Sequence, residues 1–458
     1  MPTRPEPLRA ESVTGRHAAP APAPAPAPDH TPAPASAAEP LISIRDLKVT
    51  FALRTNAVAR LLGRSSGLVH AVDGVNLDLA AGEVLGLVGE SGSGKSTLGR
   101  ALLGLVQPSS GSIRYRGTEL VGMRERQLRP LRRKLQMVFQ DPHASLNPSM
   151  TVGRAISDVL RIHGLHTNDR EQAVARALER VGLAPAAQFM PKFPTELSGG
   201  QKQRAVIARA IALGPELLVA DEPISMLDMS VRAKILDLLE ELRRDLGLTY
   251  VYITHDLASA RFFCDRIAIM YLGKIVETGP TEEIFTNPRH PYTQALLRAV
   301  PDPDPSRGQA RDLPRGEVPD AANPPAGCQF HPRCPVAFAP CGWELRDLRM
   351  ILEQRWTTVD AQQYARESAL VGDPERFASI ADTDGACLLR PASGTSDELL
   401  ALLRAEREAR PDDPFWRGVR DLSAAGSDVR LEFERRVAPQ LVPLAGAPVE
   451  VSCHLHAS

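Results

Sequence analysis

The sequence lacks a long hydrophobic run, which excludes a chain that crosses a membrane by itself. In its 458 residues, no apolar stretch approaches the length of about 18–20 residues that a membrane-spanning helix needs. The first residues, MPTRPEPLRAESVTGRH, contain none of the apolar core of a secretory signal. We therefore expect a cytoplasmic protein whose role at a membrane, if it has one, comes through a partner.

Net charge and cysteine are also scarce. The chain has 54 Lys and Arg against 55 Asp and Glu, a formal charge of −1, so charge gives no case for nucleic acid as the main partner. Six cysteines are too few for a disulfide scaffold at this length, and their grouping near the C-terminus suggests ligands instead. The hydrophobic content of 43% is ordinary for a soluble protein with two or three domains.

Alanine and proline, in contrast, dominate residues 1–40, which include APAPAPAPDHTPAPAS. Proline fixes φ and removes backbone donors, and alanine offers little surface to bury. This composition predicts a disordered tail, either a plain solvated extension or a docking arm.

The stretch Gly89–Thr97 (GESGSGKST) fits the phosphate-binding pattern G-x-x-x-x-G-K-[ST]. The apolar run Val84–Val88 before it predicts a buried strand, and Leu98, Ala101, Leu102 and Leu105 after it recur at helical spacing. A glycine-rich turn into a helix N-terminus directs N–H groups and a positive dipole end toward an anion. Lys95 would reach the β- and γ-phosphates, and the Ser96 hydroxyl would bind Mg²⁺.

Two more predicted strands precede this loop, at Leu41–Phe51 and His70–Leu79, with a basic, loop-like insertion between them at Arg54–Gly67. Phe51 stands near the end of the first strand. It is a candidate for stacking on an adenine ring, and a core phenylalanine is the alternative.

Three later strands end in polar residues that suit nucleotide chemistry. Gln140 follows the predicted strand Leu135–Phe139 and could reach Mg²⁺ or a water molecule. The strand Leu217–Glu222 ends in two acids: Asp221 could hold the Mg²⁺ shell, and Glu222 could orient a water for attack on a γ-phosphate. His255 follows Tyr250–Thr254, at the edge of a parallel sheet where ligands bind.

A second anion-binding helix start is predicted at Leu197–Gln201 (LSGGQ). It follows a helical block at Val152–Leu183. A tight loop, Ser225–Asp228, comes after the two acids, and a helix with an apolar stripe follows over Val231–Leu246. Two phosphate-binding helix starts in one chain require an explanation.

These elements, in this order over about residues 41–345, resemble the ATP-binding subunit of an ABC transporter. Gly89–Ser96 resembles Walker A, Gln140 the Q-loop, LSGGQ the signature motif, Leu217–Glu222 Walker B with the catalytic glutamate, Ser225–Asp228 the D-loop and His255 the switch histidine. The implied fold is α/β: a P-loop NTPase core with a mostly parallel sheet, an antiparallel β subdomain and an inserted helical subdomain.

The resemblance also implies functional residues and partners. Glu222, His255 and Gln140 would be catalytic, and Ser96, Gln140 and Asp221 would bind Mg²⁺. Two such subunits pair head to tail, so the signature motif faces the ATP on the partner's Walker A, which explains the second helix start. The residues expected to contact ATP on one chain or the other are Phe51, Gly89, Glu90, Ser91, Gly92, Ser93, Gly94, Lys95, Ser96, Thr97, Ser198, Gly199, Gly200, Gln201 and Asp228.

A finer resemblance is to the oligopeptide/dipeptide import branch, which includes nickel importers. It is carried by MVFQDPHASLNP (Met137–Pro148), DEPISMLD (Asp221–Asp228) and HPYTQALL (His290–Leu297). The insertion after Phe51 is similar to that of the F-type subunit. This resemblance implies a second ATPase subunit, which is a paralogue or a second copy, and two transmembrane permease subunits that are contacted near Ser145–Val152. An external solute-binding protein would act indirectly, and no nucleic acid would be a partner. The protein would lie at the cytoplasmic face of the membrane.

Domain boundaries follow from these patterns: a tail at 1–40, a nucleotide-binding domain at 41–282 with its helical subdomain at about 141–204, and a C-terminal extension at 283–458.

Three cysteines of the extension lie in GCQFHPRCPVAFAPC, at Cys328, Cys334 and Cys341, and Cys453 lies near the chain end in VSCHLH. Four thiolates suit an iron–sulfur cluster or zinc. The resemblance implies a 4Fe–4S cluster, with four reduced, unliganded thiols as the alternative.

The extension departs from the family in one respect. Residues 342–450 form an insert between the third cysteine and the final Cys-His-Leu, where the relatives have a short stretch. Cys387 in this insert competes with Cys453 as the fourth ligand, and Cys453 is favoured by its neighbours. His331 is an alternative ligand, and Cys264 is predicted to be a core residue.

Two other functions compete with transport. A soluble ABC ATPase that acts on ribosomes or DNA commonly has two cassettes or long coiled-coil insertions, and this chain has one cassette and no heptad run. A regulatory subunit without hydrolysis is disfavoured because Lys95, Asp221, Glu222, His255 and LSGGQ are all intact.

Overall fold

An eight-stranded sheet, mostly parallel in its central part, forms the centre of the protein in the computed structural model, which describes residues 39–52, 68–299, 316–380, 382 and 385–456. The strand order is β14-β15-β10-β9-β3-β8-β7-β6. Strands β6, β7, β8, β3 and β9 are parallel, and β10, β15 and β14 add antiparallel pairs at one edge. The strand bounds are β3 Val84–Val88, β6 Leu135–Val138, β7 Leu217–Asp221, β8 Thr249–Thr254, β9 Arg266–Tyr271, β10 Lys274–Pro280, β14 Val442–Pro443 and β15 Glu450–Val451.

A second, four-stranded sheet is antiparallel, in the order β2-β1-β4-β5. Its strands are β1 Ile42–Ala52, β2 Leu68–Leu79, β4 Ser110–Tyr115 and β5 Thr118–Glu119. Alternate residues of β1 are buried over much of its length, as a half-buried antiparallel strand requires. This sheet is the predicted antiparallel subdomain. The predicted insertion Arg54–Gly67 lies outside the described residues.

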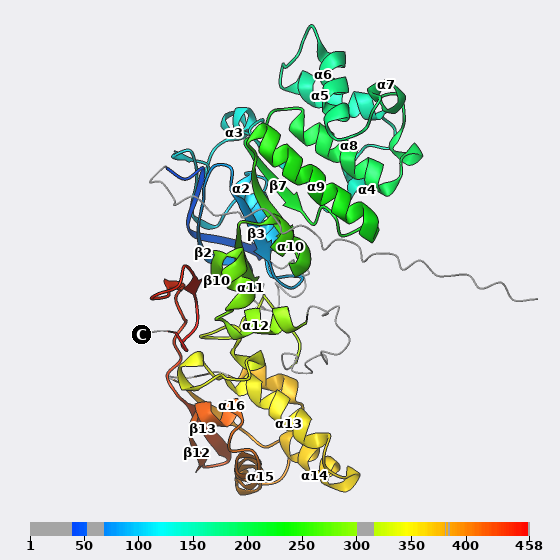
Figure 1. Ribbon diagram of the computed structural model, residues 1–458. Helices are drawn as coiled ribbons and strands as arrows, with labels where there is room; N and C mark the ends of the chain where they lie inside the picture. The colour runs from blue at the N-terminus through cyan, green and yellow to red at the C-terminus, as the bar shows by residue number, and fades with distance from the viewer. Residues whose placement is uncertain (1–38, 53–67, 300–315, 381, 383–384, 457–458) are drawn as a thin grey trace, which may run out of the picture. The chain divides into compact units, whose positions relative to one another are not determined.

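Helices connect the parallel strands and cover the sheet. Their bounds in the nucleotide-binding part are α2 Lys95–Leu102, α3 Glu125–Leu131, α4 Pro142–Ser145, α5 Val152–Ile162, α6 Arg170–Arg180, α7 Ala186–Phe189, α8 Gly199–Ile211, α9 Met229–Leu246, α10 Leu257–Phe263, α11 Thr281–Thr286 and α12 Pro291–Arg298. Helix α9 buries its predicted stripe and ends where Gly247 turns into the left-handed region, a common helix end. Helices α4–α7 gather beside α8 (Figure 1), and together they form the predicted helical block.

The predicted elements agree with the structure except at some of their ends. The helix after the phosphate-binding loop stops at Leu102, because Gly104 adopts a φ of +64°. Leu105 is therefore not on the buried face, and 46% of its surface is exposed. The strand predicted over Leu135–Phe139 ends at Val138, and Phe139 is exposed.

The insert after Cys341 folds into helices around a small sheet of order β11-β13-β12. Helix α15 lies against β12 and β13 (Figure 1). The element bounds are α13 Leu348–Trp356, α14 Ala361–Val371, β11 Ala386–Leu389, α15 Ser396–Ala409, α16 Pro414–Gly418, β12 Val419–Ala425 and β13 Asp428–Phe433. These elements and their connections bury Phe377, Leu403 and Trp416, which belong to one apolar cluster with the core of the main sheet.

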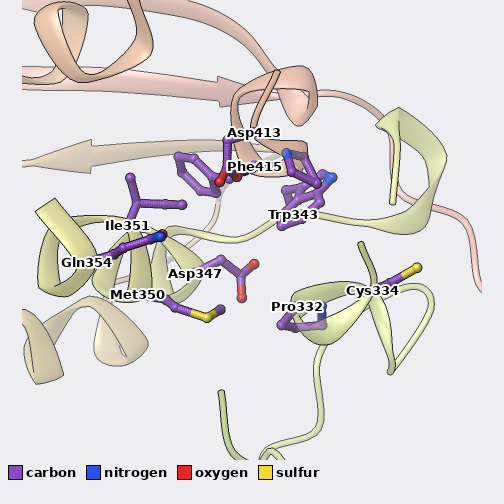
Figure 2. A pocket seen from close by; sticks show the side chains of 10 residues that line it. Pro332, Cys334, Trp343, Asp347, Met350, Ile351, Gln354, Asp413 and Phe415 are labelled. Carbon is purple, nitrogen blue, oxygen red and sulfur yellow. Dashed lines mark hydrogen bonds between the residues drawn. The ribbon is translucent and has the colours of Figure 1, made fainter. Parts of the chain in front are cut away.

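The insert packs on residues 328–341, the cysteine-containing segment. Figure 2 shows Ile351 of α13 and Phe415 of α16 in a pocket with Trp343 and Pro332. The Trp343 and Phe415 rings meet edge to face, with centroids 5.9 Å apart. The chain then returns to the main sheet, where β15 pairs with β10. This return brings the end of the chain back to the first part of the extension.

Candidate functional site

The Gly89–Thr97 loop joins β3 to α2, as the sequence predicts. Two of its glycines are required by close approach: a Cβ at Gly89 would clash with the Met270 carbonyl, and one at Gly94 would clash with the Ala71 carbonyl. Gly94 also has a φ of +100°, which disfavours any other residue. These contacts hold the loop against β9 and β2 at the start of helix α2.

Lys95 is buried inside this loop. Its ammonium donates to the carbonyls of Gly89 and Glu90, both at 2.8 Å, and to the Ser93 hydroxyl at 3.2 Å. Burial lowers the pKa of Lys95, while the carboxylates of Glu222, Asp221 and Glu90 raise it. The loop thus contains a desolvated cation beside its N–H groups, which is the electrostatic requirement of a polyphosphate site.

Ser96 and Asp221 are hydrogen-bonded at the ends of neighbouring elements. The Ser96 hydroxyl donates to Asp221 Oδ1 at 2.8 Å. Burial raises the pKa of Asp221, opposed by the Ser96 bond and the charge of Arg100. Oxygen ligands beside a nucleotide phosphate suit Mg²⁺, which is bound through one or two protein oxygens plus phosphate and water. These two residues therefore fit the ion.

Glu222 has two polar neighbours, one for each carboxylate oxygen. The Gln140 amide donates to Oε2 at 2.9 Å, and His255 Nδ1 lies 2.9 Å from Oε1. The three residues follow β6, β7 and β8, three strands adjacent in the sheet. The structure thus brings together the three side chains that the sequence predicts to be catalytic.

Glu222 also has a strained backbone. Its φ is +47°, a conformation that costs a non-glycine residue on the order of 1–3 kcal/mol. Its N–H donates to the Ile253 carbonyl on β8 at 2.9 Å, which helps to hold it there. Strain of this kind is common at functional sites.

The LSGGQ segment opens helix α8. Ser198 caps the helix by accepting from the Gln201 N–H at 3.3 Å, and Gln201 Oε1 accepts from the Ser198 N–H at 3.0 Å. Ser198 and Gly199 are exposed. Among the described residues, no hydrogen bond joins this segment to the Gly89–Thr97 loop.

Phe51 and Asp228 lie at the surface. Phe51 is 44% exposed at the end of β1 and pairs with Val69 on β2, so it is not the core residue of the alternative interpretation. Asp228 is exposed at the start of α9.

Comparisons with known proteins show the family of the chain. The ABC transporter family model matches residues 72–225, and the model described as "Oligopeptide/dipeptide transporter, C-terminal region" matches residues 276–341. The oligopeptide transport ATP-binding protein AppF of Bacillus subtilis is 45% identical over 316 residues, which cover 68% of this chain and 94% of AppF.

The chain belongs to the ATP-binding subunits of oligopeptide/dipeptide-type ABC transporters. A Brucella ovis protein that is named for peptide import and ATP binding is 43% identical over 68% of this chain and 95% of its own length. The dimeric ATP-binding cassette MJ0796, with ADP and phosphate, is 27% identical over 52% of this chain and 98% of that one, with a TM-score of 0.46. This TM-score is too low to support the family assignment, which rests on the sequence relatives.

As a member of this family, the protein is an ATPase that energises a transporter. Its fold is the ABC cassette, a P-loop NTPase of the α/β class. In the part of the chain that the structure describes, no helix has the length and apolarity to cross a membrane.

The four cysteines predicted as ligands line one pocket of this ATP-binding subunit. Cys328, Cys334, Cys341 and Cys453 share it with His290, His331 and His454. Cys387 does not line it and lies on β11, which supports Cys453 over Cys387 as the fourth member. Cys264 is buried in the core, as predicted.

In this pocket Cys328, Cys334 and Cys341 are buried and Cys453 is partly buried. Burial raises the pKa of Cys328 and of Cys334 to about 12, and it also raises the pKa values of Cys341 and Cys453. The described residues contain no group of three or more His, Cys, Asp or Glu side chains arranged to hold a metal ion. His331 is bonded elsewhere, through Nε2 to Asp347 at 3.1 Å and Nδ1 to the Cys328 carbonyl at 2.8 Å.

Two residues at the phosphate-binding loop are missed by the sequence analysis. Tyr292 accepts the Glu90 N–H at 3.0 Å, and Arg333 pairs with the Glu90 carboxylate at 3.0 Å. Tyr292 lies in the HPYTQALL motif, whose sequence indicates the family but not a contact with the phosphate-binding loop. Arg333 lies between two of the cysteines, where no local pattern indicates a contact with a residue 243 positions away.

Proposed function

We propose that this protein hydrolyses ATP to drive a membrane importer for di- or oligopeptides or a related small solute. The observation that carries the hydrolytic assignment is the carboxylate of Glu222, bonded to both Gln140 and His255 beside the Ser96–Asp221 pair. The peptide assignment is supported by AppF, which is named for oligopeptide transport, and by the C-terminal match at residues 276–341.

Each site residue has a separate role in this proposal. Lys95 and the N–H groups of the loop bind the β- and γ-phosphates, and Phe51 stacks on the adenine. Ser96, Asp221 and Gln140 would hold Mg²⁺, which would neutralise charge on the phosphates. Glu222 orients a water and accepts its proton as the water attacks the γ-phosphate. His255 positions the Glu222 carboxylate.

The second helix start belongs to the neighbour's site. In a head-to-tail pair, Ser198, Gly199, Gly200 and Gln201 face the ATP on the partner's Walker A, and Asp228 lies at the same interface. The exposure of Ser198 and Gly199 supports this role. ATP then holds the two subunits together, and its hydrolysis lets them separate. The partner is a paralogue or a second copy.

The motion passes to two transmembrane permease subunits through the Q-loop and the helical block, with contacts near Ser145–Val152. The protein is therefore placed at the cytoplasmic face of the membrane, held there by the permeases. An external solute-binding protein delivers the solute without touching this chain.

Co-purification from membranes tests this proposal. The full chain should bring down two permeases and a second ATPase subunit. The assembly in liposomes should move labelled peptide across the membrane only when ATP is supplied on the side that carries the ATPase subunits. Recovery with ribosomes or DNA and no permease would contradict the proposal and favour the soluble ABC ATPase.

We also propose that Cys328, Cys334, Cys341 and Cys453 hold an iron–sulfur cluster. Their common pocket and thiolate chemistry support this ligand set. The side chains of the described residues are not arranged around a metal ion, so the cysteines would have to turn toward the cluster to bind it. The test is iron and sulfide analysis of the anaerobically purified chain, with Cys453→Ser expected to lose both elements and Cys387→Ser to keep them. Absence of both elements from the wild type would remove the cluster.

A further inference from the structure

The phosphate-binding loop carries a negative charge of its own. Glu90 is its second residue, and its side chain is 28% exposed. Its charge acts on nearby groups: it raises the pKa of Lys95, which burial chiefly lowers, and it adds to the effect of burial that raises the pKa of Tyr292. An unpaired carboxylate here would repel a polyphosphate bound to the same loop.

Arg333 neutralises this charge from the cysteine-containing segment. Its two terminal nitrogens donate to the two Glu90 oxygens at 3.0 and 3.3 Å, the two-pronged geometry that makes arginine–carboxylate pairs strong. Only 8% of the Arg333 surface is exposed, so the pair is poorly screened by solvent and salt.

Aromatic rings hold both partners in place. The Arg333 guanidinium lies 5.9 Å from the ring centres of both Tyr271 and Phe330. The Tyr271 and Tyr292 rings lie 4.7 Å apart, and the Tyr292 hydroxyl accepts the Glu90 N–H at 3.0 Å. The loop is thus held through both its backbone and its carboxylate by residues outside the nucleotide-binding core.

We propose that Arg333 is a positioning residue for ATP: it neutralises Glu90 and so ties ATP affinity to the integrity of the cysteine-containing segment. Arg333 forms the end of the short 3-10 helix His331–Arg333, directly before Cys334. A rearrangement of the cysteine pocket would therefore move the guanidinium and change the charge at the loop. This inference rests on the loop's role as the ATP site.

A charge-balance experiment on the full chain tests it. The ATP dissociation constant is measured by calorimetry with Mg²⁺ present for wild type, Arg333→Met, Glu90→Gln and the double variant. Arg333→Met should weaken ATP binding about tenfold, equivalent to about 1.4 kcal/mol. The double variant should bind within about twofold of Glu90→Gln, because the repulsive charge is gone. If Arg333 only supported the fold, Glu90→Gln would not restore ATP affinity to the Arg333→Met chain.

Two further variants separate charge from folding. Arg346→Met removes an arginine at the start of the neighbouring insert, paired with Glu344 at 2.9 Å, and should leave ATP affinity unchanged. Arg333→Lys keeps the positive charge and should retain most of the affinity even if Arg333→Met does not fold.

Two results would overturn the inference. One is equal ATP affinity in Arg333→Met and wild type. The other is an equal loss of affinity from Arg333→Met whether or not the chain also carries Glu90→Gln. A wild type that does not bind ATP would instead contradict the proposed function.

Discussion

Both oxygens of the Glu222 carboxylate are engaged, by Gln140 and by His255, and the backbone at Glu222 is held in a strained conformation. The carboxylate therefore has one orientation set by its neighbours. The His255 side chain is 60% exposed, so its bond to Glu222 adds little to the stability of the fold. In the proposed function, this bond places the carboxylate.

Replacing His255 by Ala is therefore expected to lower ATP turnover by about 100-fold, the scale of a positioned acid–base group. The ATP dissociation constant should stay within about twofold, because His255 does not contact the phosphate-binding loop. Steady-state ATPase kinetics and equilibrium ATP binding give the two quantities.

His166 provides a matched control, because it is also exposed and lies 3.0 Å from a carboxylate, that of Asp169. His166→Ala should leave both quantities unchanged. A His255→Ala variant with the turnover of this control would contradict the positioning role.

The sequence predicts Gln140, Glu222 and His255 because each follows a short, strongly apolar strand, and parallel strands bring their carboxyl ends to one edge of the sheet. It does not predict the Arg333–Glu90 pair, because that contact depends on how the C-terminal segment folds back. Local patterns carry no information about such a contact.

At the scale of elements, Glu216 links the two sheets just before β7. Its carboxylate accepts from Tyr115 at the end of β4 at 2.7 Å and from Arg116 at 2.9 Å, and it pairs with Lys134, next to β6, at 3.1 Å. Burial alone would raise the pKa of Glu216, but these three donors hold it down at about 2, from an ordinary 4.5.

A carboxyl group whose pKa is lower in the folded state than in the unfolded state stabilises the fold at pH values above its unfolded-state pKa. This stabilisation is lost as the pH falls toward the folded-state pKa. Glu216→Gln should therefore lower the thermal midpoint at pH 7, and the difference from wild type should shrink between about pH 5 and pH 2. Circular dichroism melts across this range measure it. Glu125→Gln, at an exposed residue, should change little at any pH, and a Glu216 difference that grows on acidification would contradict the linkage.

The insert is built around a polar network. Arg355 pairs with Glu367 at 2.7 Å and with Glu406 at 2.9 Å, and the Glu406 side chain is 1% exposed. Removing one partner of a buried pair costs up to about 3–5 kcal/mol where the charge is left uncompensated. Here Arg410 still pairs with Glu406 at 3.2 Å, so the loss of Arg355 should cost less than that. The sequence does not predict this network, because its members are up to 51 residues apart.

Arg355→Met should therefore lower the unfolding midpoint of the insert in urea. The three tryptophans of the chain, Trp343, Trp356 and Trp416, all lie in this region, so their fluorescence reports on it. Arg349→Met breaks an exposed pair with Glu353 and should cost about 0.5 kcal/mol or less. Equal midpoints for the two variants would contradict a structural role for the network.

At the scale of the whole molecule, the nucleotide-binding core and the C-terminal extension meet at several places, among them the Tyr292–Glu90 hydrogen bond. Strand β15 adds to the main sheet beside β10, and Arg333 reaches the phosphate-binding loop. The sequence predicts a C-terminal extension over residues 283–458. It does not predict that the chain returns to the core sheet, because a two-residue strand has too little pattern to recognise.

The family also accounts for the separation of the two helix starts within one chain. In the proposed head-to-tail pair, the phosphate-binding loop and LSGGQ belong to different composite sites, so a working ATPase requires two subunits. In this proposal, Glu222 catalyses in a site that ATP itself has helped to assemble.

The most direct measurement of this account is ATP turnover by Glu222→Gln in the assembly purified with its permeases. Glutamine keeps the shape of the side chain but cannot accept the proton of the attacking water. The account predicts that ATP binding is retained, that the pair of ATPase subunits stays closed, and that turnover at this site falls by at least about 100-fold. Unchanged turnover would contradict the assignment of Glu222 as the catalytic base.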